Sequence, residues 1–375
     1  MAKRTSSRGV SLSPELRVCV ERVRRVHRAL ARTGCDALVV TNWTDVGYLT
    51  PFSGEGAVAI VTLTDFWILS DGRFLNELEP AKQIATVVFR KGTMRQAMVD
   101  ALQQIGARKI AVQGEHMTVD AMQGLQKDLR RISVVPTTGM ISRLRAVKGP
   151  EELAAIRKAI GIQQRALEAI LPDVRPGLPE VEIAGSLEYH MRRLGAEGTS
   201  FPTIVASGAN AARPHARAGR DKVRAGQVLL IDFGARADGY CSDMTRTFAI
   251  GRWPKGLDRA YDVVRRAFEA GVRAVGPGVR CADVDAAARK VIVDAGLGEA
   301  FTHGLGHGIG LDIHEDPRVA GISKDVLEPG NVVTIEPGVY LPGIGGIRIE
   351  DDILVTERGR TNLCSLPKDK DWATL

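Results

Sequence analysis

Three of the seven histidines in this 375-residue chain lie close together in 302–315, THGLGHGIGLDIHE. Each glycine costs a helix roughly 1 kcal/mol relative to alanine, so this stretch is not expected to be helical. In an extended chain alternate side chains share a face, so His303, Leu305 and His307 are expected to point the same way. The glycines let the backbone approach another group closely, and imidazoles that face that group predict a metal site.

A first pair of carboxylates comes from a hairpin in 228–248. The apolar run VLLID ends in Asp232, and Asp238-Gly239 is a strong hairpin-turn signal. Folding about Ala237 and Asp238 would place Asp232 opposite Asp243. Like charges that face each other across a hairpin are destabilising unless something neutralises them.

A second hairpin repeats this arrangement with glutamates. The run VVTIE ends in Glu336, a Pro/Gly turn covers 341–346, and the chain returns as IRIE with Glu350. The midpoint between the two glutamates is Gly343, inside the turn, so they should also face one another. Arg348 shares the face of Glu350 by strand alternation.

Together these residues form a predicted four-carboxylate cluster beside one imidazole. Any single acid is more commonly solvated or ion-paired, but four buried negative charges need counter-charge. Two divalent cations would supply it, and oxygen-rich ligation with one imidazole suits Mn²⁺, Co²⁺, Fe²⁺ or Zn²⁺, with Mn²⁺ the expected ion. The predicted metal ligands are Asp232, Asp243, His307, Glu336 and Glu350.

An internal repeat is expected to bring the two hairpins together. A Pro-Gly pair at 176–177 precedes a predicted helix that ends at Gly195, and the same frame recurs at 277–278 and Gly296, an offset of 101 residues at both ends. Another predicted helix, 150–171 or 258–275, precedes each copy, and strands follow. Two related halves predict a pseudo-twofold domain with a site on its axis.

The first 145 residues predict a separate α/β domain, because strands alternate with helices there. Helices are expected at 16–34 and 118–129, and strands at 35–41, 56–63, 66–69 and 109–113. The domain boundary is placed near Arg145, giving domains 1–145 and 146–375. Pro150, followed by two glutamates, is a favourable helix start.

Composition is that of an ordinary globular protein, with 44% hydrophobic and 25% charged residues. The chain has no apolar run of membrane-spanning length, and its basic N-terminus lacks the apolar core of a signal peptide, so we expect a cytoplasmic protein without a membrane partner. Five scattered cysteines without a CxxC motif predict neither a disulfide framework nor a thiolate metal site. The net charge of +7 is dispersed and accompanies no nucleic-acid-binding motif, so no nucleic-acid partner is expected.

Several longer motifs resemble one known family. SFPTIVASGANAARPH, LLIDFGARADGYCSDMTRTF, HGLGHGIGLDIHEDPRV, LEPGNVVTIEPGVY and GIRIEDDILVTERG are similar to the proline-specific pita-bread metallopeptidases, aminopeptidase P and prolidase. NWTDVGYLTPFSG, ILSDGRF and LRAVKGPEELAAIRKA resemble the creatinase-type N-terminal domain and its join. The resemblance implies an α/β creatinase-like N-terminal domain and an α+β pita-bread catalytic domain with pseudo-twofold symmetry.

The resemblance also implies an activity and residue roles. The expected reaction is hydrolysis of Xaa-Pro bonds in dipeptides or at peptide N-termini, by a homodimer. Glu336 would be a proton shuttle as well as a ligand, and His303 and His314 would donate hydrogen bonds to the peptide and the oxyanion. The residues implied in substrate binding or in supporting the site are His215, Tyr340, Arg348 and Arg318.

Some alternatives stay open. Arg318 could clamp a dipeptide's free carboxylate, as in a dipeptidase, or could be a solvated loop arginine, which leaves aminopeptidase and dipeptidase undecided. A hydrolase or lyase of a small non-peptide substrate on the same fold is an alternative, and a metal-free binding protein is another.

Overall fold

The computed structural model describes residues 12–375, which divide into two compact units. The first ends at Leu144 and the second is Arg145–Leu375. The short helix α5 (Ser142–Ala146) contains the covalent join. Within the described residues, none of the helices combines the length and apolar character needed to span a bilayer.

The first unit is a mixed six-stranded sheet with helices on both faces. Its strands run in the order β4-β3-β2-β1-β5-β6; the β1–β2 and β2–β3 pairs are antiparallel and the other three pairs are parallel. The elements are α1 (Pro14–Leu30), β1 (Ala37–Val40), α2 (Trp43–Leu49), β2 (Val58–Thr62), β3 (Phe66–Ser70), β4 (Thr86–Phe89), α3 (Met94–Ile105), β5 (Lys109–Gln113), α4 (Val119–Asp128) and β6 (Ser133–Thr137).

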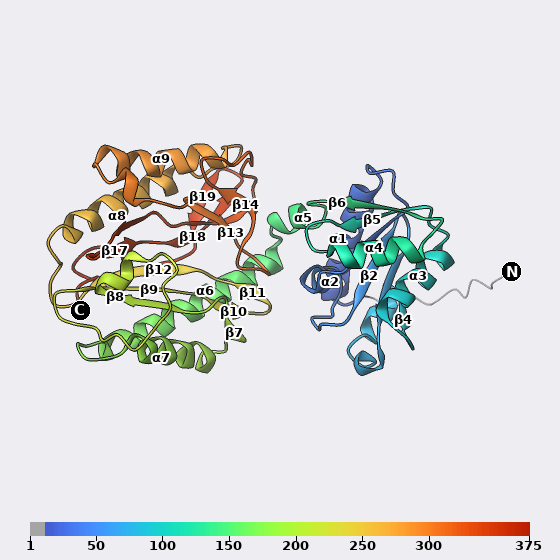
Figure 1. Ribbon diagram of the computed structural model, residues 1–375, viewed down its shortest axis with the longest axis horizontal. Coiled ribbons are helices and arrows are strands. Elements are labelled where there is room, and N and C mark those ends of the chain that lie inside the picture. The colour runs from blue at the N-terminus through green and yellow to red at the C-terminus, as the bar shows by residue number, and fades with distance from the viewer. Residues whose placement is uncertain (1–11) are drawn as a thin grey trace. The chain divides into compact units, whose positions relative to one another are not determined.

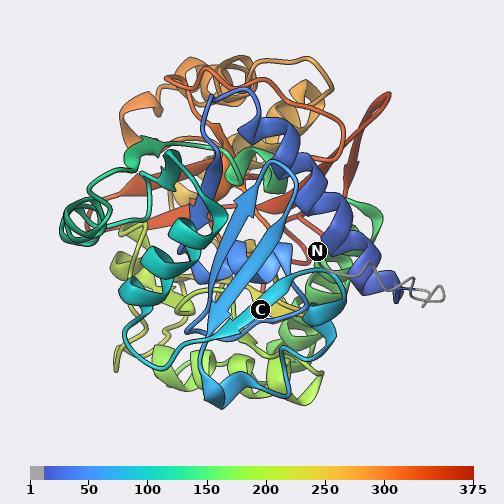
Figure 2. The same cartoon turned by 90° about the vertical axis from the view of Figure 1, so that its right-hand side faces the viewer.

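Burial explains this layering. All four residues of β1 are buried, as a central strand covered on both faces requires. Ala37 and Val39 pack with side chains of α3 and α4, and α1 and α2 cover the opposite face; Figure 2 shows α1 (dark blue) and α3 and α4 (teal) beside the strands. The expected α/β domain is therefore present. Its first helix starts at Pro14, capped by the Ser13 hydroxyl, and ends four residues earlier than expected.

The second unit contains the expected repeat. Its four long helices are α6 (Pro150–Ile170), α7 (Glu180–Arg193), α8 (Leu257–Ala274) and α9 (Cys281–Asp294). The starts of α7 and α9 differ by 101 residues, and so do their ends. Gly195 and Gly296 follow these helices with positive φ of 101° and 78°, the left-handed conformation that terminates helices at glycine.

The helices enclose the strands, as Figure 1 shows: α8 and α9 lie on one side and α6 and α7 on the other. The strands are β7 (Gly198–Thr199), β8 (Ile204–Ser207), β9 (Val228–Phe233), β10 (Ala235–Ala237), β11 (Tyr240–Cys241), β12 (Met244–Ala249), β13 (Gly306–Gly308), β14 (Glu315–Val319), β15 (Val332–Ile335), β16 (Gly338–Leu341), β17 (Gly345–Arg348), β18 (Asp351–Thr356) and β19 (Gly359–Asn362). They form sheets ordered β12-β9-β8, β11-β10-β7, β14-β13-β15-β18-β19 and β16-β17. One hydrophobic core joins both halves of the repeat.

Helix α6 begins where the sequence predicts. Pro150 occupies its first turn, and the Glu152 carboxylate accepts a hydrogen bond from the Gly149 N–H at 2.8 Å. The five cysteines, all within the described residues, are buried and free.

Candidate metal centre

The first hairpin has a different register from the predicted one. Asp232 pairs with Thr245, two residues beyond the expected partner Asp243. The reason is the turn: Asp238 and Gly239 both have positive φ, 49° and 79°, so they are the two central residues of a primed turn. The prediction centred the turn one residue too early. Asp243 still shares a face with Thr245 by alternation, so both aspartates remain on the same side.

The second hairpin has the predicted register. Ile335 pairs with Asp351 on one side of the glutamates, and Gly338 pairs with Arg348 on the other. Both pairs are symmetric about Gly343, as predicted. Glu336 and Glu350 occupy the gap between the two ladders, where the chain passes from one sheet to the next.

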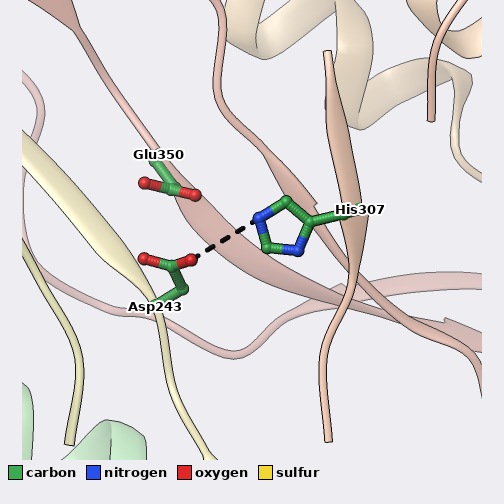
Figure 3. Close-up of side chains that lie close together, drawn as sticks. All are labelled: Asp243, His307 and Glu350. Atoms are coloured by element: carbon green, nitrogen blue, oxygen red, sulfur yellow. Dashed lines mark ion pairs between the residues drawn. The ribbon is translucent and has the colours of Figure 1, made fainter. Parts of the chain in front are cut away.

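Three side chains from both halves of the repeat converge at one point. Asp243 lies between β11 and β12, His307 is on β13, and Glu350 lies between β17 and β18. Each offers a ligand atom, and these atoms all lie within 4.8 Å of one another. In Figure 3 the two carboxylates face the imidazole, and the dashed line joins His307 Nε2 to Asp243 Oδ2 at 3.7 Å.

The protonation pattern of this group fits a cation. His307 Nδ1 lies 3.1 Å from its acceptor, the Gly308 carbonyl, which fixes the proton on Nδ1 and leaves a lone pair on Nε2. Burial, and then the nearby His314, lower the pKa of His307 to about 3, so the ring is neutral. Its Nε2 lone pair therefore faces the carboxyl oxygens, and together these atoms could serve as ligands of a divalent ion.

The carboxylates support the same conclusion. Burial is the first cause, and neighbouring carboxylates the second, of raised pKa values at Asp243 and Glu350. Asp243 Oδ1 and Asp232 Oδ1 are buried with no hydrogen-bond partner in the described protein. Buried carboxylate oxygens without donors are costly, and they are the ligands that hard divalent cations prefer.

Glu336 approaches the same ring nitrogen of His307 as Asp243 does. Its Oε1 is 3.5 Å from His307 Nε2, and its backbone N–H donates to the Leu305 carbonyl at 2.8 Å. Burial raises the pKa of Glu336 to about 8, with Arg348 opposing the shift and Asp232 adding to it. A carboxyl that titrates near neutral pH can accept and return a proton during catalysis.

Arg348 holds the second aspartate in place. Its guanidinium is buried and donates to Asp232 Oδ2, to the Tyr340 hydroxyl at 2.7 Å and to Thr245 Oγ1 at 3.0 Å. Thr245 in turn donates to Glu350 Oε2 at 2.6 Å. The network therefore joins one carboxylate of each half of the repeat.

His303 has an environment that differs from the expectation. Its Nε2 lies 2.9 Å from the Tyr340 hydroxyl and its Nδ1 2.8 Å from the Gly304 carbonyl. Because Nδ1 faces a carbonyl oxygen, it carries the ring proton, so the tyrosine O–H donates to Nε2 and both ring nitrogens are occupied. In this arrangement neither ring nitrogen is free to donate, and the expected donation from His303 to a peptide stays a prediction.

The expected common face of 303–307 is also wrong. Leu305 packs into the hydrophobic core, in contact distance of Gly271 on α8, whereas His307 faces the carboxylates. The strand starts only at Gly306 and its ladder is irregular between Gly306 and Gly308, so simple alternation does not extend across the stretch.

The remaining predicted residues differ in their placement. The His314 ring is exposed and packs edge-on against the His307 ring at 4.4 Å between centroids. His215 is exposed and close enough to contribute to the lowered pKa values of His303 and His314, for which burial is the first cause. Arg318 is exposed on β14, and its guanidinium has no hydrogen bond or ion pair to the part of the chain that the structure describes.

Sequence reasoning missed Thr245. This buried hydroxyl connects Glu350 to Arg348, and the corrected hairpin register would have placed it opposite Asp232. It also missed Asp352, whose Oδ2 accepts the Asp243 backbone N–H at 3.1 Å. No signal in the sequence distinguishes Asp352 from the adjacent Asp351.

Comparison with known proteins agrees with this geometry. Residues 154–357 match the model of metallopeptidase family M24, and residues 22–147 match the Creatinase/Prolidase N-terminal domain. The chain is 32% identical to the Xaa-Pro dipeptidase of Pyrococcus horikoshii over 355 residues, which are 93% of this chain and 98% of that protein.

Solved structures show the same relationship. An Xaa-Pro dipeptidase from Bacillus anthracis superposes with a TM-score of 0.91 at 35% identity, covering 95% of this chain and 100% of that one. An X-Pro aminopeptidase from Thermotoga maritima gives 0.82 at 32% identity, covering 91% and 99%. The expected creatinase-like N-terminal domain and pita-bread domain are confirmed, and the chain belongs to metallopeptidase family M24.

Proposed function

We propose that this protein is a metal-dependent exopeptidase that hydrolyses the bond between a first residue and a following proline. The observation that carries the proposal is the group formed by Asp243, His307 and Glu350, in which ligand atoms from both halves of the repeat lie within 4.8 Å of one another. The similarity to Xaa-Pro dipeptidases and an X-Pro aminopeptidase over nearly the whole chain supports the choice of substrate.

The proposed metal ligands are His307 and four carboxylates. Asp232, Asp243, His307, Glu336 and Glu350 would together hold two divalent ions, with Mn²⁺ the proposed metal. Such ions polarise a scissile carbonyl and lower the pKa of a water molecule to near neutrality.

Glu336 is the proposed proton carrier. Its carboxyl lies beside His307, where it would take a proton from the attacking water and pass it to the leaving proline nitrogen. That proton is required, because a proline nitrogen leaves as a secondary amine. Arg348 donates hydrogen bonds to Asp232 and to Tyr340 and holds both side chains in place.

His314 is the proposed direct donor to the substrate. Its exposed ring packs against His307, so it lies at the rim of the centre, whereas the ring nitrogens of His303 are already occupied. His215 is proposed to line the same substrate-binding region. The role of His303 is then to orient the Tyr340 hydroxyl.

Arg318 is the proposed determinant of chain length. A dipeptide ends in a free carboxylate one residue beyond the cleaved bond, and an unpaired guanidinium suits bidentate binding of it. Arg318 meets that requirement with its exposed guanidinium. Comparing hydrolysis of Ala-Pro with Ala-Pro-Ala separates a dipeptidase from an aminopeptidase.

One experiment tests the proposed function. Metal-depleted protein is reloaded with Mn²⁺, Co²⁺ or Zn²⁺ and assayed on Ala-Pro, Ala-Pro-Ala and Ala-Ala. Selective cleavage of the proline substrates is expected, with none in Glu336→Gln and full activity in Glu299→Gln, an exposed glutamate used as control. Hydrolysis of non-peptide substrates alone, or failure to bind any divalent ion, would overturn the proposal.

The proposed assembly is a homodimer, as the family resemblance implies. Sedimentation velocity of the metal-loaded protein tests it. A monomer at assay concentrations would contradict this part of the proposal and leave the reaction unaffected.

A further inference from the structure

Helix α9 carries a charged pair on the face that points towards the metal centre's supporting loop. Asp285 and Arg289 are one helical turn apart and form two hydrogen bonds, 2.8 Å from Nε and 3.0 Å from Nη2. The Asp285 side chain is 2% exposed and that of Arg289 is 32% exposed. An ordinary salt bridge on the protein surface is not buried to this extent, so the pair is expected to have a further role.

Both residues also bind the backbone of 301–305, the segment that carries His303. Asp285 Oδ1 accepts the Leu305 N–H at 3.0 Å. Arg289 donates to the Phe301 carbonyl at 3.1 Å and to the His303 carbonyl at 2.7 Å, and its guanidinium lies 4.1 Å from the centre of the Phe301 ring. The Phe301 ring in turn packs edge-on against the His303 ring, 5.0 Å between centroids.

The segment that is held in this way has two connections to the centre. His303 Nε2 accepts the hydroxyl of Tyr340, which Arg348 also contacts. The Leu305 carbonyl accepts the backbone N–H of Glu336 at 2.8 Å. Asp285 and Glu336 therefore bind opposite sides of the same residue, one at its N–H and the other at its carbonyl.

We propose that Asp285 and Arg289, here called the positioning pair, align Glu336 and the His303–Tyr340 couple for catalysis. Arg289 acts mainly on His303 through the two carbonyls, and Asp285 acts mainly on Glu336 through Leu305. The 301–305 segment lies outside the strands, so these side chains supply the hydrogen bonds that a strand ladder would otherwise give. The kinetic consequences of this proposal rest on the proposed function, whereas its structural consequences do not depend on that function.

A matched control lies on the same helix. Arg280 and Asp283 also form a two-hydrogen-bond pair, at 3.0 and 2.6 Å, but their side chains are 68% and 54% exposed. Within residues 12–375, the hydrogen bonds and ion pairs of these two side chains do not reach the 301–305 segment. Arg280→Met removes an equivalent charge and ion pair without touching the proposed positioning route.

The first test uses hydrogen exchange in metal-free protein and needs no activity. Arg289→Met and Asp285→Ala should accelerate exchange at the Leu305 and Glu336 amides. The Ile309 amide, which donates to the Val332 carbonyl, should keep its wild-type rate. Equal acceleration at all three amides would show general loosening and overturn the proposal, as would unchanged exchange at Leu305 and Glu336.

The second test separates positioning from folding by kinetics. Arg289→Met should lower kcat about 10- to 100-fold with little change in KM, the size expected when a catalytic group is misplaced by a fraction of an ångström to about 1 Å. Arg280→Met should keep wild-type kcat. In a Tyr340→Phe background, Arg289→Met should lower kcat by a smaller factor, because the His303–Tyr340 hydrogen bond is already absent.

Conservative variants complete the design. Asp285→Asn keeps an oxygen acceptor for Leu305, so it should retain more activity than Asp285→Ala, and Arg289→Lys more than Arg289→Met. An unchanged Arg289→Met effect in the Tyr340→Phe background, or equal losses in Arg280→Met, would refute the inference. If the wild-type protein cleaves no Xaa-Pro bond, the proposed function fails, and the exchange measurements alone decide on the positioning pair.

Discussion

Glu336→Gln is expected to abolish hydrolysis and, in the metal-free protein, to stabilise the second unit at neutral pH. The two effects share one cause, because the burial that raises the pKa of Glu336 is the burial that places its carboxyl beside His307. An isosteric amide removes the ionisable proton while keeping the shape and the oxygen near Thr334. The carboxyl of Glu336, the proposed proton carrier, therefore lowers the stability of the metal-free protein by a measurable amount.

The size of this cost follows from the pKa of Glu336, which rises from 4.5 to about 8 on folding. Below pH 4.5 both states hold the proton, and above pH 8 neither does. Between these values the native state holds more protons than the unfolded state, so stability falls as pH rises. The slope is about 1.4 kcal/mol per pH unit, which amounts to about 3 kcal/mol at pH 7 and somewhat more at pH 8.

The assay is urea unfolding of EDTA-treated wild type and Glu336→Gln from pH 5 to 8. Fluorescence of Trp253 and Trp372 reports the second unit when Trp43 and Trp67 are replaced by phenylalanine. The stability advantage of Glu336→Gln should grow with pH, and Glu299→Gln should give no such trend. If the difference in unfolding free energy between Glu336→Gln and wild type stayed constant from pH 5 to 8, the assignment of a buried, protonated carboxyl at this position would be refuted.

Three further outcomes are expected. Mn²⁺ at about 100 times its Kd should stabilise the second unit by about 2.7 kcal/mol, and Asp243→Asn, which removes a ligand oxygen, should lose most of this gain in chelator-controlled melts. Arg318→Ala should raise KM for Ala-Pro about 10-fold or more while sparing Ala-Pro-Ala, because only the dipeptide presents its carboxylate there; equal KM changes for both would contradict the clamp. Burial lowers the pKa of His303 from 6.5 to about 4. Between pH 6.5 and pH 4 the unfolded state therefore binds more protons than the native state, and the metal-free protein should lose stability as the pH falls through this range. His303→Gln should flatten this dependence in the same urea series, and an unchanged slope would contradict it.

Hairpin chemistry explains how much of the centre was predictable. The glutamate register is correct because the Pro/Gly turn around Gly343 is symmetric in the sequence and in the structure. The aspartate register is off by two because the choice between turn centres at Ala237–Asp238 and Asp238–Gly239 depends on both residues adopting positive φ. The repeat offset of 101 residues is correct because glycine ends both helices.

Contacts between distant segments were beyond this kind of reasoning. Both ring nitrogens of His303 are engaged, one with the Gly304 carbonyl and the other with the Tyr340 hydroxyl, and the histidine motif alone does not reveal these contacts. Helix α2 contains Gly47 and depends on an Asn42 cap, so its sequence resembles a turn more than a helix. The role of Thr245 could be recognised only from the observed pairing of the strands.

The proposed ligands come from both halves of the repeat, and this has a consequence for the synthesis of the chain. Asp243 belongs to the first half of the repeat and Glu350 to the second, more than a hundred residues later. A chain synthesised only as far as β16 contains the aspartates, His307 and Glu336 but lacks Glu350, so its ion site is incomplete. Tight metal binding should therefore occur only after the final hairpin is complete. Ion binding would then stabilise the folded second unit late in its formation, and no shorter fragment could gain this stabilisation.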